Sequence, residues 1–347
     1  MPPAASTDGS SPSLSYGEAT LHVDNPEDCF LAQDVKLCAE IEQEAGEVDY
    51  KFEIVWKHVF FMALLHIGTV GGLYLMFSGT SMWQTFAWAL FIAHYVQVSI
   101  TGGAHRLWTH KAFKANYGVR LFFMIGTTLA MENHVIWWAL QHRCHHKWTD
   151  SDADPHNAKR GFFFSHMGWL LIKRHPKTIE MGKKIDMSDL EADELLVFQR
   201  DYLKIITPLF YAIVSWVPWY FWGETFVSSI LVAGFFRAAL QYHMTWMINS
   251  VAHLYGDKPF DKTMSAVDNI FASIWTGGEA WHNFHHVFPQ DYRASEYMWK
   301  ANLTGAMLDF FAYQGWIWDR KIMSKEAIER QKRNYGDHSR PVKCAVR

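Results

Sequence analysis

Four apolar runs constrain the fold of this chain more than any other feature. The first covers residues 54–77, and the second covers residues 83–103 after residues 78–82, which carry no charge. The third and fourth cover residues 205–222 and 225–248 and follow each other almost directly. Each run is close to the ~20 residues that a helix needs to cross a bilayer. The pattern predicts four membrane spans arranged as two helical hairpins.

The positions of lysine and arginine predict the orientation of these spans. The two hairpin tips, residues 78–82 and 223–224, contain neither residue type, whereas residues 106–204 and the C-terminal tail contain many. Because positively charged residues concentrate on the cytosolic side of membrane proteins, we expect both termini and the long central segment to face the cytosol.

Three histidine clusters lie just outside the predicted spans, on the side assigned to the cytosol. They are HRLWTH at His105–His110, HRCHH at His142–His146 and HNFHH at His282–His286. The HxxHH spacing of the second and third clusters places three imidazoles on one face of a helix. His105 and His110 need a helix end or a kink to converge, because five helical steps turn the chain about 140° past a full turn.

The three clusters together indicate a dimetal site. Imidazole is a good ligand for Fe, Zn, Cu or Ni, and a buried neutral ring has both a donor and an acceptor to satisfy. His253, four residues after Asn249 at the cytosolic end of the last span, is a candidate ninth ligand. Eight or nine nitrogen ligands exceed the four of a structural zinc site, so two metal ions are expected.

Other interpretations of the histidines stay open at this point. Each cluster alone could be a hydrogen-bonded or surface feature, and the whole set could belong to a non-enzymatic metal-binding or haem-binding membrane protein. A transporter is disfavoured, because the polar residues concentrate outside the spans. The remaining histidines are interpreted as structural or solvated, among them His66, His94, His166, His243 and His338.

These features predict an all-α, polytopic membrane protein with a helical cytosolic cap that holds the dimetal site. Residues 1–50 are rich in Ser, Pro, Asp and Glu, so a mobile cytosolic N-terminal tail is expected there. Residues 51–335 would form the membrane domain, with residues 104–204 and 249–335 as its cap. Residues 336–347 would form a C-terminal tail. No nucleic-acid-binding motif is present, so no nucleic-acid partner is expected.

The sequence around the histidines resembles the membrane acyl-CoA desaturases of animals, the stearoyl-CoA type, with an insect-like character. The resemblance extends from about Val55 to Tyr335 and rests on TGGAHRLWTHKAF, HRCHHKWTDSDADPHNAKRGFFFSHMGWLL, NSVAHLYGDKPFDKT and EAWHNFHHVFPQDYRASEY. It implies two iron ions as cofactor. The matching ligand positions are His105, His110, His142, His145, His146, His253, His282, His285 and His286, with Asn249 reaching a metal through water.

The reaction that this resemblance implies removes two hydrogens from adjacent methylenes of a saturated long-chain acyl-CoA. O₂ is reduced to water with two electrons from cytochrome b5 and its NADH-dependent reductase, as part of unsaturated fatty acid biosynthesis. Because the chain has no HPGG haem motif, the electron donor is expected to be a separate protein. The expected double bond is cis, at the delta-9 or another mid-chain position. A fatty acyl hydroxylase, conjugase or acetylenase with the same iron centre is the alternative.

The resemblance also implies a location in the endoplasmic reticulum membrane, in contact with lipid, and a set of substrate contacts. The matching positions are Trp138 and Thr245 at the bend of an acyl tunnel, Ala93 and Gln97 near its closed end, Lys173 and Arg174 at the CoA phosphates, and Asn133. Charge-assisted hydrogen bonds to phosphate are strong, which suits the basic pair to that role.

The chain departs from the family pattern near the expected substrate site. Leu140 and Gln141 stand where Arg and Asp are usual, Glu132 where a tunnel Gln is common, Lys57 and His58 where Arg and Asn are usual, and Ala280 where a Gly is usual. None of these departures removes an expected metal ligand. They bear on CoA affinity, acyl preference and the position of the double bond.

Overall fold

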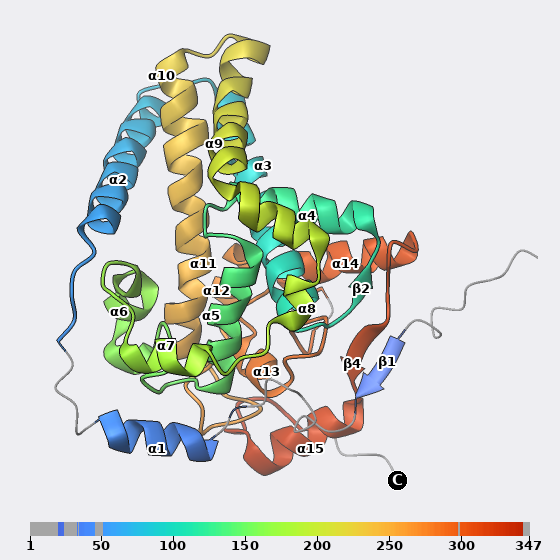
Figure 1. The fold of residues 1–347 in the computed structure, drawn as a ribbon. Helices are drawn as coiled ribbons and strands as arrows, with labels where there is room; N and C mark the ends of the chain where they lie inside the picture. The colour runs from blue at the N-terminus through green and yellow to red at the C-terminus, as the bar shows by residue number, and fades with distance from the viewer. Residues whose placement is uncertain (1–19, 24–32, 34, 46–50, 298, 343–347) are drawn as a thin grey trace, which may run out of the picture.

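The computed structural model describes residues 20–23, 33, 35–45, 51–297 and 299–342 of the chain. This part is mostly helical, and its long helices form a stem above a broader body of shorter helices and loops (Figure 1). The architecture therefore agrees with the predicted helical fold, and two small sheets in the body add to it.

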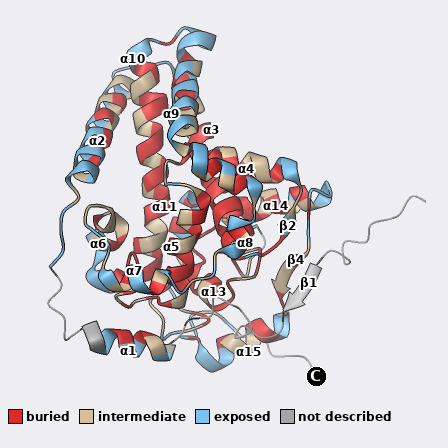
Figure 2. Cartoon of the chain, viewed as in Figure 1, coloured by how far each residue is buried: buried red, intermediate tan, exposed pale blue. Residues whose placement is uncertain are grey.

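Two stem helices are long and apolar enough to cross a membrane, α2 (Trp56–Phe77) and α9 (Glu194–Trp222). They cover almost all of the first predicted span and all of the third. In each, 17% of the most apolar stretch is buried inside the protein, and exposed residues run along both helices (Figure 2). Apolar surfaces this large are unusual on a soluble protein, so these helices indicate association with a membrane.

The second and fourth predicted spans are helical too, but their hydrogen-bonding pattern changes along their length. α3 (Trp83–Ser99) continues into the π-helix η2 (Ile100–Thr109), and α10 (Phe226–Ser228) continues through the π-helix η5 (Ser229–Phe236) into α11 (Arg237–Leu254). α11 packs against α3, while η5 packs against α2 and α9, so these helices form one stem (Figure 1). Whether all four cross the membrane stays a prediction.

Glu224 ties the two hairpin tips together. This residue connects α9 to α10, and its carboxylate accepts hydrogen bonds from the Met82 amide and the Thr85 hydroxyl, both at 2.7 Å, at the start of α3. Hydrogen bonds to a charged group contribute about 1.5–3 kcal/mol each, so this contact fixes one hairpin against the other.

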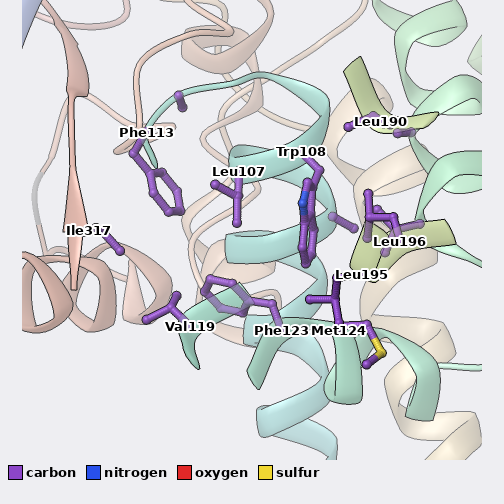
Figure 3. Close-up of a cluster of buried hydrophobic side chains, with 14 of the residues drawn as sticks. Leu107, Trp108, Phe113, Val119, Phe123, Met124, Leu190, Leu195, Leu196 and Ile317 are labelled. Atoms are coloured by element: carbon purple, nitrogen blue, oxygen red, sulfur yellow. The ribbon is translucent and has the colours of Figure 1, made fainter. Parts of the chain in front are cut away.

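The body holds the segments between and after the hairpins. Its helices are α4 (Tyr117–Leu129), α5 (Val135–Lys147), η3 (Ala158–Arg160), α6 (Phe162–His166), η4 (Gly168–Leu170), α7 (Pro176–Gly182), α8 (Ser188–Glu191), α12 (Ile270–Trp275), α13 (His282–Val287), α14 (Leu303–Tyr313) and α15 (Lys325–Tyr335). A cluster of buried apolar side chains joins stem to body, where Leu107 and Trp108 of η2 pack with Phe123 of α4 and Leu196 of α9 (Figure 3). This cluster supports one side of the histidine-bearing segments.

Short strands depart from the purely helical prediction. β1 (Thr20–Val23) pairs in parallel with β4 (Arg320–Met323), and β2 (Lys114–Ala115) pairs antiparallel with β3 (Ile317–Trp318). Strands of two to four residues are too short to leave an alternating apolar pattern, so they could not be predicted.

The segment predicted as an N-terminal tail contains ordered elements besides β1. Helix α1 (Val35–Ala45) places Cys38 and Ile41 in a buried cluster with Cys144 and Trp148 of the body. Most of the other residues of this segment lie outside the described part of the chain, and its mobility stays a prediction.

Candidate metal centre

The three histidine clusters and His253 converge where the stem meets the body. The histidines come from the end of η2, the last two turns of α5, the last turn of α11 and the short helix α13. On α5 and α13 the HxxHH spacing turns three rings to one side, as predicted. The structure thus brings together side chains far apart in sequence, such as those of His105 and His285, which are 180 residues apart.

The π-helix η2 explains how His105 and His110 converge. The amide of His110 donates to the carbonyl of His105 at 3.1 Å, a hydrogen bond between residues five apart. Such bonding widens the helix and brings residue i+5 closer to the face of residue i than α-helical bonding does. The two ring centroids are 4.6 Å apart. The predicted distortion at the exit of the second span is therefore present, and it takes the form of a π-helix.

All nine predicted histidine ligands fall into two compact groups. One group consists of His105, His110, His142, His146 and His285, and the other consists of His145, His253, His282 and His286. Within each group the candidate ligand atoms all lie within 4.8 Å of one another. Neighbouring Nε2 atoms are 2.9–3.2 Å apart.

These spacings suit metal ions better than hydrogen bonds. Nε2 of His146 lies 3.1 Å from that of His142 and 2.9 Å from that of His285, yet a neutral imidazole has a single N–H donor for its two nitrogens. Two nitrogens bound at a right angle to one ion, each ~2.1 Å from it, lie about 3.0 Å apart. Each group could therefore hold one metal ion.

Burial keeps these rings in the form that binds metal. It is the main cause that lowers the pKa values of seven of them well below the usual range, and neighbouring histidines lower the pKa values further. These seven are His110, His142, His146, His253, His282, His285 and His286. Metal binding requires the neutral imidazole, so the centre would not have to lose protons from these rings near neutral pH.

Glu279 lies directly behind the first group. One carboxylate oxygen is 2.6 Å from Nδ1 of His105, and the other accepts hydrogen bonds from Nε and Nη2 of Arg106. Burial alone would raise the pKa of Glu279, but the Arg106 charge and the contact with His105 outweigh it and lower the pKa to about 2. A carboxylate that accepts from the outer nitrogen of a ligand ring fixes the ring's orientation.

Two residues support the second group in the same way. Both oxygens of Asp154 lie 3.0 Å from Nδ1 of His145, and the Ser265 hydroxyl lies 2.7 Å from Nδ1 of His253. His156, which is buried beside His145 and Asp154, forms a third candidate ligand group with them.

The sequence prediction named neither Asp154 nor His156, nor Glu279. The acidic run DSDADPH directly after the second cluster was the available signal for the first two.

Of two predicted substrate contacts, Trp138 is partly buried and Ala93 is buried. The Trp138 ring stacks on the ring of His142, with centroids 5.0 Å apart and planes 25° apart, and Ala93 of α3 is fully buried. Trp138 therefore lies directly beside the first metal group.

Two further predicted tunnel residues are linked to Trp138 through Glu132. Trp138 Nε1 donates to Glu132 at 3.0 Å, and Gln241 Nε2 donates both to Glu132 at 2.6 Å and to the Thr245 hydroxyl at 3.2 Å. The Thr245 hydroxyl in turn lies 3.5 Å from Gln97 Oε1. Burial raises the pKa of Glu132 to about 7 against the opposing effect of these hydrogen bonds. Glu132, a departure from the family pattern, thus occupies the middle of the network.

The predicted CoA contacts lie at the edge of the body. Arg174 donates to Oε1 of Gln141 at 3.1 Å, and its guanidinium lies 5.6 Å from the ring centre of Trp137. Lys173 is exposed and pairs with Glu53 at 2.6 Å. Gln141, another departure from the family pattern, therefore positions a residue that was predicted to bind CoA.

Two predicted site residues have no contact that tests their role. Asn133 is exposed in a left-handed backbone conformation, with φ of 77°, and its side chain accepts from the amide of His134. Asn249 lies on α11 one turn before His253 and is partly exposed. Their roles toward substrate and metal stay predictions.

The chain is similar to known proteins over most of its length. The family model described as fatty acid desaturase matches residues 81–299. The chain is 47% identical over 313 residues to the delta(9)-fatty-acid desaturase fat-6 of Caenorhabditis elegans, across 90% of this chain and 92% of that protein. It is 46% identical over 288 residues to the stearoyl-CoA desaturase of Homo sapiens, across 83% of this chain and 80% of that protein. The chain therefore belongs to the fatty acid desaturase family.

Proposed function

We propose that this protein is an acyl-CoA desaturase that introduces a cis double bond into a saturated long-chain acyl-CoA. The observation that carries the proposal is the pair of buried histidine groups, each able to hold one metal ion. We assign both ions as iron, which would supply the oxidising power that an unactivated C–H bond requires. The name of the Caenorhabditis elegans relative, a delta(9)-fatty-acid desaturase, favours the delta-9 position over other mid-chain positions.

The overall reaction balances with O₂ as the oxidant. A –CH₂–CH₂– unit, one O₂, two protons and two electrons give –CH=CH– and two water molecules. The electrons would come from cytochrome b5 and its NADH-dependent reductase. The supporting feature is the pair of histidine groups, whose ions would receive these electrons.

The side chains next to the first metal group would hold the acyl chain. Trp138 offers an apolar ring beside His142, and Thr245 and Gln97 lie on the hydrogen-bonded network that fixes that ring. A chain threaded past Trp138 would present its methylenes to the histidine side of the site. Ala93 would set the depth of the tunnel, since a larger side chain at this buried position would shorten it.

The CoA group would bind at the edge of the body. Arg174 is held by Gln141 and by the Trp137 ring, so its charge is positioned before substrate arrives. The side chains of Lys173, which pairs with Glu53, and of Asn133 are exposed, which suits contacts with phosphate and ribose oxygens. Arginine is well matched to phosphate by its planar set of donors.

The proposed location is the endoplasmic reticulum membrane, with four spans and both termini in the cytosol. The exposed apolar faces of α2 and α9 support contact with lipid, and the shared stem supports similar depths for α3 and α11. The histidine groups lie at the body end of the stem, where soluble acyl-CoA and the electron donor would have access.

Expression in yeast that lacks its own desaturase tests the function. We expect a new monoene by mass spectrometry, no product from His145→Ala, and full activity from His338→Asn, a change at an exposed histidine outside the metal groups. A product that retains oxygen would indicate a hydroxylase, and a conjugated diene or a triple bond would indicate a conjugase or an acetylenase. If iron-loaded protein gives no new product from any saturated chain length, the proposal is wrong.

A further inference from the structure

Three histidines outside the metal centre contact one another in a row. Nε2 of His66 on α2 lies 3.2 Å from Nε2 of His243 on α11, and Nδ1 of His243 lies 3.0 Å from Nε2 of His166 on α6. Nδ1 of His166 lies 2.8 Å from the hydroxyl of Ser250. The sequence analysis interpreted these rings as structural or solvated residues outside any cluster, whereas the structure brings the three of them together.

The row of contacts ends on each side at a backbone carbonyl oxygen, which accepts hydrogen bonds but cannot donate them. Nδ1 of His66 lies 2.7 Å from the carbonyl of Met62, and the Ser250 hydroxyl donates to the carbonyl of Trp246 at 2.9 Å. The row thus contains five contacts. Three neutral imidazoles and one hydroxyl carry four protons, so one contact has no proton.

The missing proton can be placed by working inward from the two ends. His66 donates from Nδ1 to its carbonyl, which leaves a lone pair on its Nε2. From the other end, Ser250 donates to its carbonyl, His166 donates from Nδ1 to the Ser250 hydroxyl, and His243 donates from Nδ1 to Nε2 of His166. Nε2 of His243 is then left with a lone pair as well. Two lone pairs face each other across 3.2 Å, which is unfavourable unless a cation lies between them.

We propose that the two Nε2 atoms of His66 and His243 bind one divalent transition-metal ion of the Zn²⁺ type. Two nitrogens ~2.1 Å from one ion lie roughly 3.0–3.4 Å apart for angles between a right angle and the tetrahedral angle, which includes the observed spacing. The outer nitrogen of each ring has an acceptor, the Met62 carbonyl for one and His166 for the other, as the outer nitrogens of metal-binding histidines almost always do. Both rings are partly exposed, so the ion would keep open coordination positions.

The surroundings support a bound cation at this position. Phe162 stacks on His166 with centroids 5.2 Å apart, and the Trp246 ring lies edge-on to both His166 and His243. Burial lowers the pKa of His166, so this ring is neutral near pH 7 and can accept from His243. His66 lies within a helix long enough to span a membrane, where an ionisable side chain marks a functional site by default.

Metal stoichiometry of the full chain in detergent tests this site. Zn²⁺ bound at saturation is counted by mass spectrometry in the wild type and in the His66→Asn and His243→Asn variants. His94→Asn is the matched control, because Nδ1 of His94 also bonds a carbonyl four residues earlier, at 2.8 Å, in another predicted span. We expect both site variants to bind one Zn²⁺ fewer than the wild type and the control. His166→Ala should keep the stoichiometry but bind this ion ~10–100-fold more weakly.

Equal Zn²⁺ stoichiometry in the wild type and His243→Asn would overturn the proposal. If the melting temperature of the wild type then also rises, relative to His243→Asn, when the pH falls from 7.5 to 5.5, a proton rather than a metal ion fills the gap between the two rings. The count is a difference between variants, so it stands whether or not the nine-histidine centre supports desaturation.

Discussion

Replacement of Glu279 by Gln tests how charge supports the metal centre. Glu279 is 2% exposed, and its carboxylate is shared between Arg106, which is 1% exposed, and Nδ1 of His105. Gln keeps the shape of the side chain but removes its charge, so Arg106 becomes a buried cation without a counter-ion. We expect a less stable protein that also binds metal more weakly at the first group.

The size of the effect follows from the buried pair. Removing one partner of a buried ion pair costs about 3–5 kcal/mol. The pKa of Glu279 falls from its ordinary 4.5 to about 2 in the folded protein. At ~1.4 kcal/mol per pH unit, this shift corresponds to about 3 kcal/mol in favour of the charged carboxylate. Loss of the acceptor behind a ligand ring should weaken metal binding ~10–100-fold.

The pH dependence gives the expected sign. Because folding lowers this pKa, the stabilisation is fully present above pH 4.5 and is lost as the pH falls toward 2. The assay compares the free energy of unfolding of metal-free wild type and Glu279→Gln at pH 7 and pH 3. The difference between the two proteins should shrink by about 2 kcal/mol between these conditions.

Glu296→Gln is the control for loss of a partly buried ion pair away from the metals. Glu296 pairs with the buried Lys332. This change should lower stability while leaving metal affinity unaltered. Equal stability of Glu279→Gln and wild type at pH 7, or an equal difference at pH 7 and pH 3, would refute the assigned role of the carboxylate.

Three further predictions concern single groups. Burial raises the pKa of Glu132 from 4.5 to about 7, so its contribution to stability is present below pH 4.5 and is lost as the pH rises through 7. Glu132→Gln should therefore melt higher than the wild type at pH 8.5 and no higher at pH 4. Arg174→Gln should raise the KM for acyl-CoA about tenfold, from loss of one charged hydrogen bond, with unchanged iron content. Burial raises the pKa of Cys144 to about 12 and leaves it 1% exposed, so iodoacetamide at pH 8 should label it only after unfolding, by mass spectrometry.

The metal ligands could be predicted because their signal is local. An HxxHH spacing fixes three side chains on one face before any tertiary contact forms, and α5 and α13 each present such a face. For His105 and His110, the sequence predicted only that the helix must be distorted for the two rings to converge. The sequence offers no rule that selects a π-helix over a kink, because the choice depends on packing around η2.

Residues that act through distant partners could not be predicted in this way. Glu279 becomes a support for His105 only after folding joins segments more than 170 residues apart. His66 and His243 are 177 residues apart and each is the sole histidine on its helical turn. A single histidine in an apolar run gives no indication of its partner, whereas a cluster indicates a site by itself. The pairing of β1 with β4 could not be predicted either, because the two strands are also far apart in sequence.

The position of His105 depends on packing that lies outside the metal centre. A Cβ added to Gly103, two residues earlier on η2, would lie 2.6 Å from Cβ of Phe123, too close for any side chain. Phe123 is fully buried in the cluster that includes Trp108 and Leu196, so it cannot move aside cheaply. The close approach of η2 to α4 therefore requires glycine at this position, and this approach sets the distance from His105 to the histidines of α5 and α13. The precision of the proposed iron centre thus derives from the apolar core as much as from the ligands.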